Sequence, residues 1–239
     1  MKHLLSLALA GALCAQALAQ SSDTVPFPAG PVLAKAPNFA KWTMTITSTP
    51  KATAGSSAGS PSTETKATTQ AIVTTTKTFP IRLVVTSDAK RGTSTIWCVG
   101  SSEVIQNQQF QKPFVSTSGN QGFVDFSHCD FPELEWITEA NYVGLEKSGE
   151  GQALLFRTKI VLHGRGQTAS DHIEIDIPCE AKIDAQTRLP MSFQKGDEMF
   201  TYKFDQVPTS ILSLPPDIKS ILDQEQSRLK RLARVPPHG

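Results

Sequence analysis

The residues best suited to chemistry in this sequence are His128, Cys129 and Asp130, which follow one another directly. A thiol beside a base is the arrangement of a cysteine nucleophile. Neighbouring residues of a strand point to opposite faces, however, so three consecutive side chains rarely form one catalytic group. No partner base can be placed at a distance. We therefore expect burial or a disulfide, rather than catalysis, at Cys129.

Two histidines flank a polar segment in a way that raises the question of a metal site. Hairpin pairing around 164–171 would bring His163 and His172 near each other, with Asp171 beside them. Two imidazoles and a carboxylate are ligands for a transition metal. The segment also has the composition of an ordinary hairpin tip, where histidines are solvated. We expect neither a metal nor a cofactor.

Carboxylate pairs occur at Glu133 and Glu135, and at Glu174 and Asp176. A spacing of two places Glu174 and Asp176 on one face of a strand, while isoleucines occupy the alternating positions. This pattern is typical of a strand with one solvated face, and it gives no support to general acid–base catalysis. The chain also lacks a glycine-rich phosphate loop and a Cys-x-x-Cys pair. We therefore expect no catalytic residue and a protein that is not an enzyme.

The chain begins with the features of a secretory signal peptide. A basic start precedes an apolar run at 4–18, and Ala17-Leu18-Ala19 provides the small residues that favour cleavage before Gln20. The run is shorter than the roughly 20 apolar residues of a transmembrane helix. We expect residues 1–19 to be removed. The mature chain would then be exported to the periplasm or secreted, without a transmembrane segment.

Export also bears on the cysteines and on the charge of the mature chain. Cys98, Cys129 and Cys179 are disulfide candidates in an oxidising compartment, and their odd number leaves one thiol over. Their spacing fits no zinc motif. Without residues 1–19, which hold one lysine and no acid, the chain has 22 basic and 22 acidic residues. This balance gives no electrostatic case for nucleic acid.

Short segments rich in Val, Ile and Thr, separated by turns that contain Gly, Pro or Asp, predict an antiparallel meander. The expected strands are residues 41–47, 71–78, 80–87, 93–99, 103–106, 123–126, 142–147, 152–162, 172–177, 179–184, 189–195 and 198–204. Residues 48–69 are rich in Ser and Thr, which predicts a flexible loop, with O-glycosylation as an alternative. Residues 106–122 predict a second loop, and 131–137 predict one or two helical turns.

These elements divide the mature chain into an extended lead-in at 20–40, a curved β domain at 41–207 and a helical segment at 208–239. Pro215-Pro216-Asp217 is a good helix start. The apolar face of this predicted amphipathic helix consists of Ile218, Ile221, Leu222, Leu229 and Leu232. We expect it to pack on the sheet, and the basic residues near its end to be solvated, with an anionic surface as the alternative ligand.

The most distinctive segment runs from Cys179 to Met191 and includes Ile183-Asp184-Ala185-Gln186-Thr187-Arg188-Leu189-Pro190. Asp184 is placed to accept backbone amides two residues on, and the proline opens the return strand, where it needs no ladder hydrogen bond. This segment resembles a hairpin of the periplasmic lipoprotein-carrier (LolA-like) superfamily, whose core reads Ile-Asp-x-x-Thr-x-Leu-Pro. Phe193–Phe204 continues the resemblance, which covers about 142–207.

That resemblance implies a mainly β protein with minor α structure: a strongly curved antiparallel sheet, or half-barrel, with a C-terminal amphipathic helix. Members of the superfamily enclose an apolar cavity and carry or sense the acyl chains of lipoproteins. It thus implies a lipid or acyl-chain ligand on the concave face. The candidate lining residues are bulky apolar ones on predicted strands: Trp97, Phe156, Phe193, Phe200 and Phe204. A place in an ordinary core is the alternative for each.

Two other functions stay open at this point. The chain fits a structural or protein-interaction module of the cell envelope, which would dock an envelope protein through a sheet edge, the basic helix or the loop 48–69. A hydrolase would require a histidine and a carboxylate brought together from distant strands. An exported, non-catalytic binding protein for an apolar or lipid-like ligand is the leading hypothesis.

Overall fold

A computed structural model of the chain describes residues 25–49, 67–100, 102–108, 112–117, 129–149, 151–165 and 172–232. The predicted signal peptide at 1–19, most of the loop 48–69 and the predicted strand 123–126 lie outside the described residues. Within the described ranges, no helix is both long enough and apolar enough to cross a bilayer.

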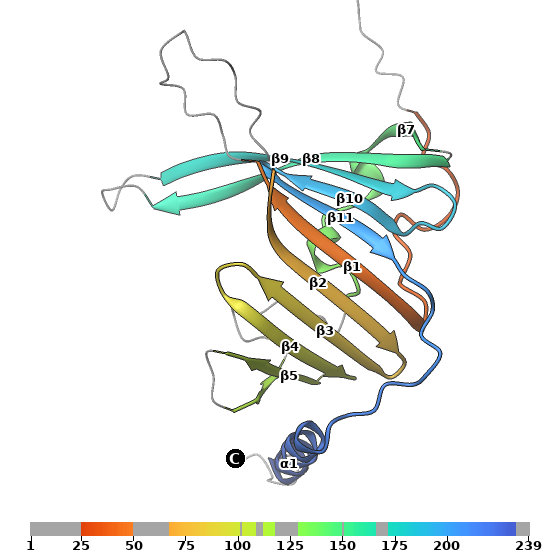
Figure 1. Ribbon diagram of the computed structural model, residues 1–239. Helices are drawn as coiled ribbons and strands as arrows, with labels where there is room; N and C mark the ends of the chain where they lie inside the picture. Colours follow the sequence, from red (N-terminus) through yellow and green to blue (C-terminus); the bar gives the residue numbers. More distant parts are fainter. Residues whose placement is uncertain are drawn as a thin grey trace, which may run out of the picture.

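In the described part of the chain, eleven antiparallel strands form one open sheet (Figure 1). The strands are β1 (Phe39–Ser48), β2 (Thr68–Thr78), β3 (Ile81–Asp88), β4 (Gly92–Val99), β5 (Ser102–Asn107), β6 (Phe114–Thr117), β7 (Tyr142–Ser148), β8 (Gly151–Arg165), β9 (His172–Asp184), β10 (Pro190–Lys195) and β11 (Glu198–Phe204). Two meanders, β1 to β6 and β7 to β11, are joined by the pairing of β1 with β11.

The sheet is strongly curved and does not close. β6 and β7 form its two ends, and Figure 1 shows β8 and β9 crossing the direction of β1 and β2 steeply. One α-helix, α1 (Pro216–Leu232), follows the last strand. The predicted fold class, a curved antiparallel half-barrel with a C-terminal helix, is therefore confirmed.

Two local predictions were wrong. The predicted loop 106–122 contains strand β6, which pairs with β5. The predicted strands 172–177 and 179–184 form one strand, β9, that continues through Pro178. The carbonyl of Pro178 accepts a hydrogen bond from the Gly196 amide at 3.0 Å. The missing N–H of the proline points to that same side, beyond the end of β10, and therefore not toward β8, so the β8–β9 ladder continues.

Direct cross-strand pairing defines two faces of the sheet. Trp42, Thr75 and Val84 are paired neighbours on β1, β2 and β3, and they lie on what we call the inner face. The next residues along the same strands, including Lys41 and Leu83, lie on the outer face, because side chains alternate along a strand. Each strand therefore contributes to both faces in alternate positions.

Helix α1 covers part of the outer face. Ile218 and Leu222 are almost fully buried, and they pack against Trp97 of β4 and Val104 of β5. The predicted packing of the helix on the sheet is confirmed for these residues; the side chains of Leu229 and Leu232 lie outside the described part. A hydrogen bond of 2.8 Å from the Leu212 amide to the Thr78 hydroxyl holds the chain before α1 on the same face.

The inner face carries the main core, which two irregular segments cover. The first is the lead-in from 25 to 38, and the second runs from 129 to 141 and contains the 3₁₀ helices η1 (Pro132–Leu134) and η2 (Glu139–Asn141). Phe131 is 1% exposed, and its ring lies 5.5 Å from that of Trp42. Both segments therefore shield the core from solvent, although neither has a long helix.

The hairpin between β9 and β10 forms the turn that its sequence predicts. The Asp184 carboxylate accepts hydrogen bonds from the Gln186 amide at 3.1 Å and the Thr187 amide at 2.6 Å. These bonds hold the pKa of Asp184 below its usual range. Arg188 has a left-handed backbone (φ 60°) and donates to the Ala29 carbonyl at 2.8 Å. The turn thereby fixes the lead-in to the end of the sheet.

Candidate functional site

The structure brings together three of the five aromatic residues proposed to line a ligand site. Phe200, Phe193, Ala181 and Phe156 form one directly paired row across β11, β10, β9 and β8. The rings of Phe193 and Phe200 lie 5.1 Å apart. Phe156 and Phe193 are at most 2% exposed, and the inner-face core contains both. In this structure the row is part of the packed core.

The two remaining aromatics lie elsewhere. Phe204 is on the inner face, with its ring 6.0 Å from Trp42. Trp97 is on the outer face beneath α1, so it cannot share a cavity with the others. No local pattern in the chain indicates this separation, because the face of each strand depends on its register with distant strands. Whether any of the five contacts a ligand stays a prediction.

The residues with reactive side chains are not assembled into a nucleophilic or metal site in the described part of the chain. Cys98, Cys129 and Cys179 are thiols and form no disulfide. Burial raises the pKa of the Cys129 and Cys179 thiols, which opposes formation of a thiolate. The strand register places His163 opposite Glu174 and His172 opposite Arg165, so the two histidines are not paired with each other.

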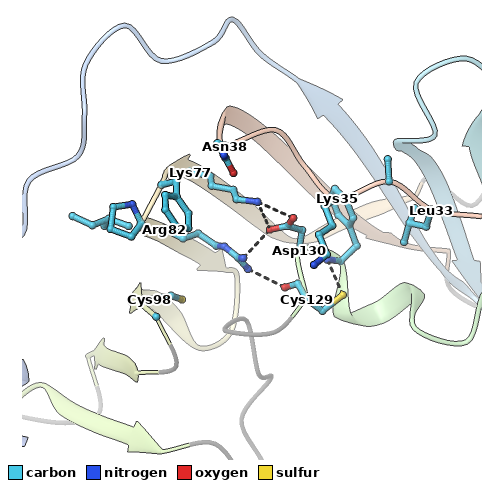
Figure 2. Close-up of a pocket in the computed structure, with 14 residues that line it drawn as sticks. Leu33, Lys35, Asn38, Lys77, Arg82, Cys98, Cys129 and Asp130 are labelled. Atoms are coloured by element: carbon cyan, nitrogen blue, oxygen red, sulfur yellow. Dashed lines mark hydrogen bonds and ion pairs between the residues drawn. The ribbon is translucent and has the colours of Figure 1, made fainter. Parts of the chain in front are cut away.

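A cavity of about 650 Å³, which we call cavity 1, lies at the rim of the inner face. It lies where the β2–β3 hairpin meets the two segments that cover the core (Figure 2). Its apolar walls include Leu33, Phe79, Pro80, Ile81 and Phe131. Its volume is within the usual range for small-ligand sites, roughly 300–1,000 Å³.

The charged side of cavity 1 is organised around Asp130. Its carboxylate lies 2.9 Å from the Lys77 ammonium and 2.7 Å from the Arg82 guanidinium, and it accepts the Ala36 amide at 2.9 Å. The Asp130 side chain is 4% exposed, and those of Lys77 and Arg82 are 13% and 12% exposed. Figure 2 shows the two cations reaching the carboxylate from neighbouring strands. The cluster connects the lead-in, β2, β3 and the segment 129–141.

Sequence reasoning missed this cluster, because it treated Asp130 only as a neighbour of Cys129. One signal was present. Lys77 follows Val73 and Thr75 at alternate positions of a predicted strand, so it belongs to their face. A lysine on a face that packs into a core requires a partner. The sequence offered no means of choosing Asp130 as that partner, since 53 residues separate it from Lys77.

A partly buried carboxyl group, that of Glu133, lies beside Tyr202 of the inner-face core. The Tyr202 hydroxyl donates a hydrogen bond to the Glu133 carboxylate. Burial raises the pKa of Glu133 above its usual value of 4.5, although the bond from Tyr202 opposes this effect. Burial, together with the negative charge of Glu133, raises the pKa of Tyr202 as well. The charged form of Glu133 is therefore unfavourable in the folded protein.

We expect Glu133→Gln to remove a pH dependence of stability. Because the folded-state pKa of Glu133 is raised, its full contribution is present below the unfolded-state pKa and is lost as pH rises through the folded-state pKa. The introduced amide oxygen can still accept the Tyr202 hydroxyl. Urea unfolding from pH 4 to 8 should show the variant gaining on the wild type as pH rises, by on the order of 1 kcal/mol at pH 8. The exposed Glu135→Gln is the control, and parallel curves for wild type and Glu133→Gln would contradict the expectation.

A second cavity, of about 880 Å³, runs along α1 and is of a different kind. Its lining is mostly polar and includes Lys219, Asp223 and Arg228. Lys219 and Asp223 form an ion pair at 2.6 Å, and Arg228 pairs with Glu225, also at 2.6 Å. These side chains satisfy one another on the helix, so this cavity offers little to an apolar ligand.

The structural comparison pairs this chain with a protein of the superfamily that its hairpin resembles. A LolA superfamily protein from Nitrosomonas europaea matches over 76% of this chain and 90% of its own length, with 8% sequence identity and a TM-score of 0.31. No protein-family model matches the chain, and no curated protein matches it. The feature of the described structure that bears most directly on function is cavity 1.

Proposed function

We propose that this protein is an exported, non-catalytic binding protein that holds an apolar or lipid-like ligand in cavity 1. The observation that carries the proposal is the cavity itself, with apolar walls on one side and ammonium and guanidinium groups on the other. The segment 1–19 supports export, because it has the features of a signal peptide. The resemblance of about 142–207 to LolA-like hairpins agrees with an acyl-chain ligand.

Cavity 1 suits such a ligand better than the aromatic row does. The row is buried beneath the segments that cover the core, and entry would require those segments to move. Phe79, in contrast, is 65% exposed at the tip of the β2–β3 hairpin and lines the cavity. Exposed aromatic side chains are costly in water, and contact with a ligand would bury this one.

Native mass spectrometry of the gently purified exported protein tests the proposal. Adducts with the mass of a lipid should appear in the native spectrum and vanish on denaturation. Phe79→Ala should weaken the binding of a lipid probe about tenfold while leaving stability within about 1 kcal/mol, because the side chain is largely solvated. Bare protein in several lipid-rich preparations, together with an unchanged affinity in Phe79→Ala, would reject the proposal.

A protein-interaction module of the cell envelope is the second candidate, and the ends of β8 and β9 favour it. Within the described part of the chain, residues 160–165 and 172–177 pair only with each other, since β7 and β10 end before them. Ile175 and Val161 on this two-stranded arm are 52% and 43% exposed. An extended segment of an envelope protein would add to such an open edge by backbone pairing. Slower hydrogen exchange of 160–165 in the presence of the envelope fraction would support this candidate, and unchanged exchange would reject it.

A further inference from the structure

We propose that the ligand of cavity 1 is an anionic amphiphile: an apolar chain that carries a carboxylate or phosphate group, bound by Lys35 at the positively charged side of the cavity. This inference rests on the proposed function and specifies the ligand class of the same site. The lining residues contain three cationic side chains, Lys35, Lys77 and Arg82, against one carboxylate, that of Asp130. The polar side of the cavity is thus richer in donors and positive charge than in acceptors.

The single carboxylate among the lining residues is already occupied by the protein. Oδ1 of Asp130 lies 2.7 Å from Arg82 and 3.2 Å from Lys77. Oδ2 accepts the Lys77 ammonium and the Ala36 amide, each at 2.9 Å. Because these donors take both oxygens, Asp130 has little capacity left to bind the donor of a ligand. A cationic head group would therefore lack a free carboxylate partner among these lining residues.

Lys35, in contrast, has donor hydrogens available to a ligand. The three hydrogens of the Lys77 ammonium are taken by the Ala36 carbonyl at 2.9 Å and by the two oxygens of Asp130 at 2.9 and 3.2 Å, so Lys77 contributes positive charge rather than a spare donor. Lys35 is exposed at the rim and makes no ion pair with the residues that the structure describes. Figure 2 shows Lys35 and Lys77 reaching into the same cavity around Asp130. An anionic group beside Lys35 would receive charge-assisted hydrogen bonds from its ammonium.

The apolar walls of the cavity favour an anion that carries an apolar chain. Phe79, Pro80 and Ile81 follow Lys77 closely in the sequence, around the turn of the β2–β3 hairpin, and all three line the cavity. A small inorganic anion would leave this surface in contact with water. An acyl chain would cover it, which is favourable because apolar surface is removed from water. The cavity thus combines a head-group site with a chain site.

Isothermal titration calorimetry on the mature chain with three probes distinguishes the outcomes. Laurate should bind about tenfold more tightly than lauryl alcohol, and acetate should bind far more weakly than either. Equal affinity for laurate and lauryl alcohol would overturn the head-group inference and leave the apolar-ligand proposal standing. Equal affinity for acetate and laurate would overturn the amphiphile and indicate a small-anion site. Binding of none of the probes would overturn both the inference and the proposed function.

Matched lysine variants locate the head group. Lys35→Ala should weaken laurate binding roughly two- to fivefold, the range of an exposed ion pair, and leave lauryl alcohol unchanged. Lys41→Ala is the control, because Lys41 is exposed on the outer face of β1 and does not line the cavity. Added salt should reduce the advantage of laurate over the alcohol. Equal effects of the two lysine variants on laurate would overturn the assignment.

Discussion

Replacing Asp130 with alanine is expected to lower the free energy of unfolding by about 3–5 kcal/mol. The change removes the carboxylate that lies between the Lys77 and Arg82 cations, both of which are nearly buried. It also removes the acceptor of the Ala36 amide. Breaking one partner of a buried charge cluster is far more costly than deleting the whole cluster, because the desolvated charge remains. Urea unfolding followed by tryptophan fluorescence measures the effect.

Two further variants make this expectation specific to the cluster. Asp176→Ala is the matched control: its carboxylate is 57% exposed and lies 3.5 Å from Lys159, and its loss should cost less than about 1 kcal/mol. Lys77→Met in the Asp130→Ala background should recover part of the lost stability, because it removes a cation without a carboxylate partner. An Asp130→Ala variant within about 1 kcal/mol of the wild type would show that the cluster contributes little to folding.

Phe156→Ala should lower the free energy of unfolding by a similar amount, about 3–5 kcal/mol. The side chain is 0% exposed, and its ring lies 5.7 Å from Tyr142 and 6.2 Å from Phe27. Truncation removes apolar burial and leaves a void between the sheet and the lead-in. Phe156→Leu retains much of the volume and should cost less. Chemical unfolding of both variants provides the comparison.

This experiment also separates a core role from a ligand role. If the aromatic row lined an open cavity, Phe156→Ala would leave stability nearly unchanged and weaken the lipid probe. If the row is packed core, Phe156→Ala lowers stability and leaves the lipid probe bound. Phe79→Ala should do the opposite, because Phe79 is 65% exposed at the hairpin tip. A Phe156→Ala variant with wild-type stability and reduced laurate affinity would move the binding site from cavity 1 to the inner face.

Asp130 also holds together the segments that form the walls of cavity 1. Its carboxylate ties the lead-in, through Ala36, and the segment 129–141 to the end of β2 and β3. The same strands carry the hairpin whose tip presents Phe79. The walls of cavity 1 therefore depend on a contact that also stabilises the fold. Binding measurements on Asp130 variants are best interpreted beside their unfolding curves.

Local pattern alone determined much of the secondary structure. Alternating apolar residues predicted most strands, and the turn at Asp184 followed from its ability to accept nearby amides. The buried positions Ile218 and Leu222 were evident from the period of an amphipathic helix. Strand β6 was missed because it has only four residues between polar segments. Pro178 divided β9 in the prediction, because sequence does not show which side of a strand lacks a neighbour.

Tertiary structure decided the site. The pairing of β1 with β11 joins the two meanders, and no local signal specifies it. Register decided that Trp97 packs under α1 whereas Cys98, the next residue, lines cavity 1. The meeting of Asp130 with Lys77 and Arg82 depends on how the segment 129–141 folds back over the inner face. Short-range sequence patterns indicate which residues are buried. The contacts that create a cavity join residues far apart in the chain, and only the complete fold brings those residues together.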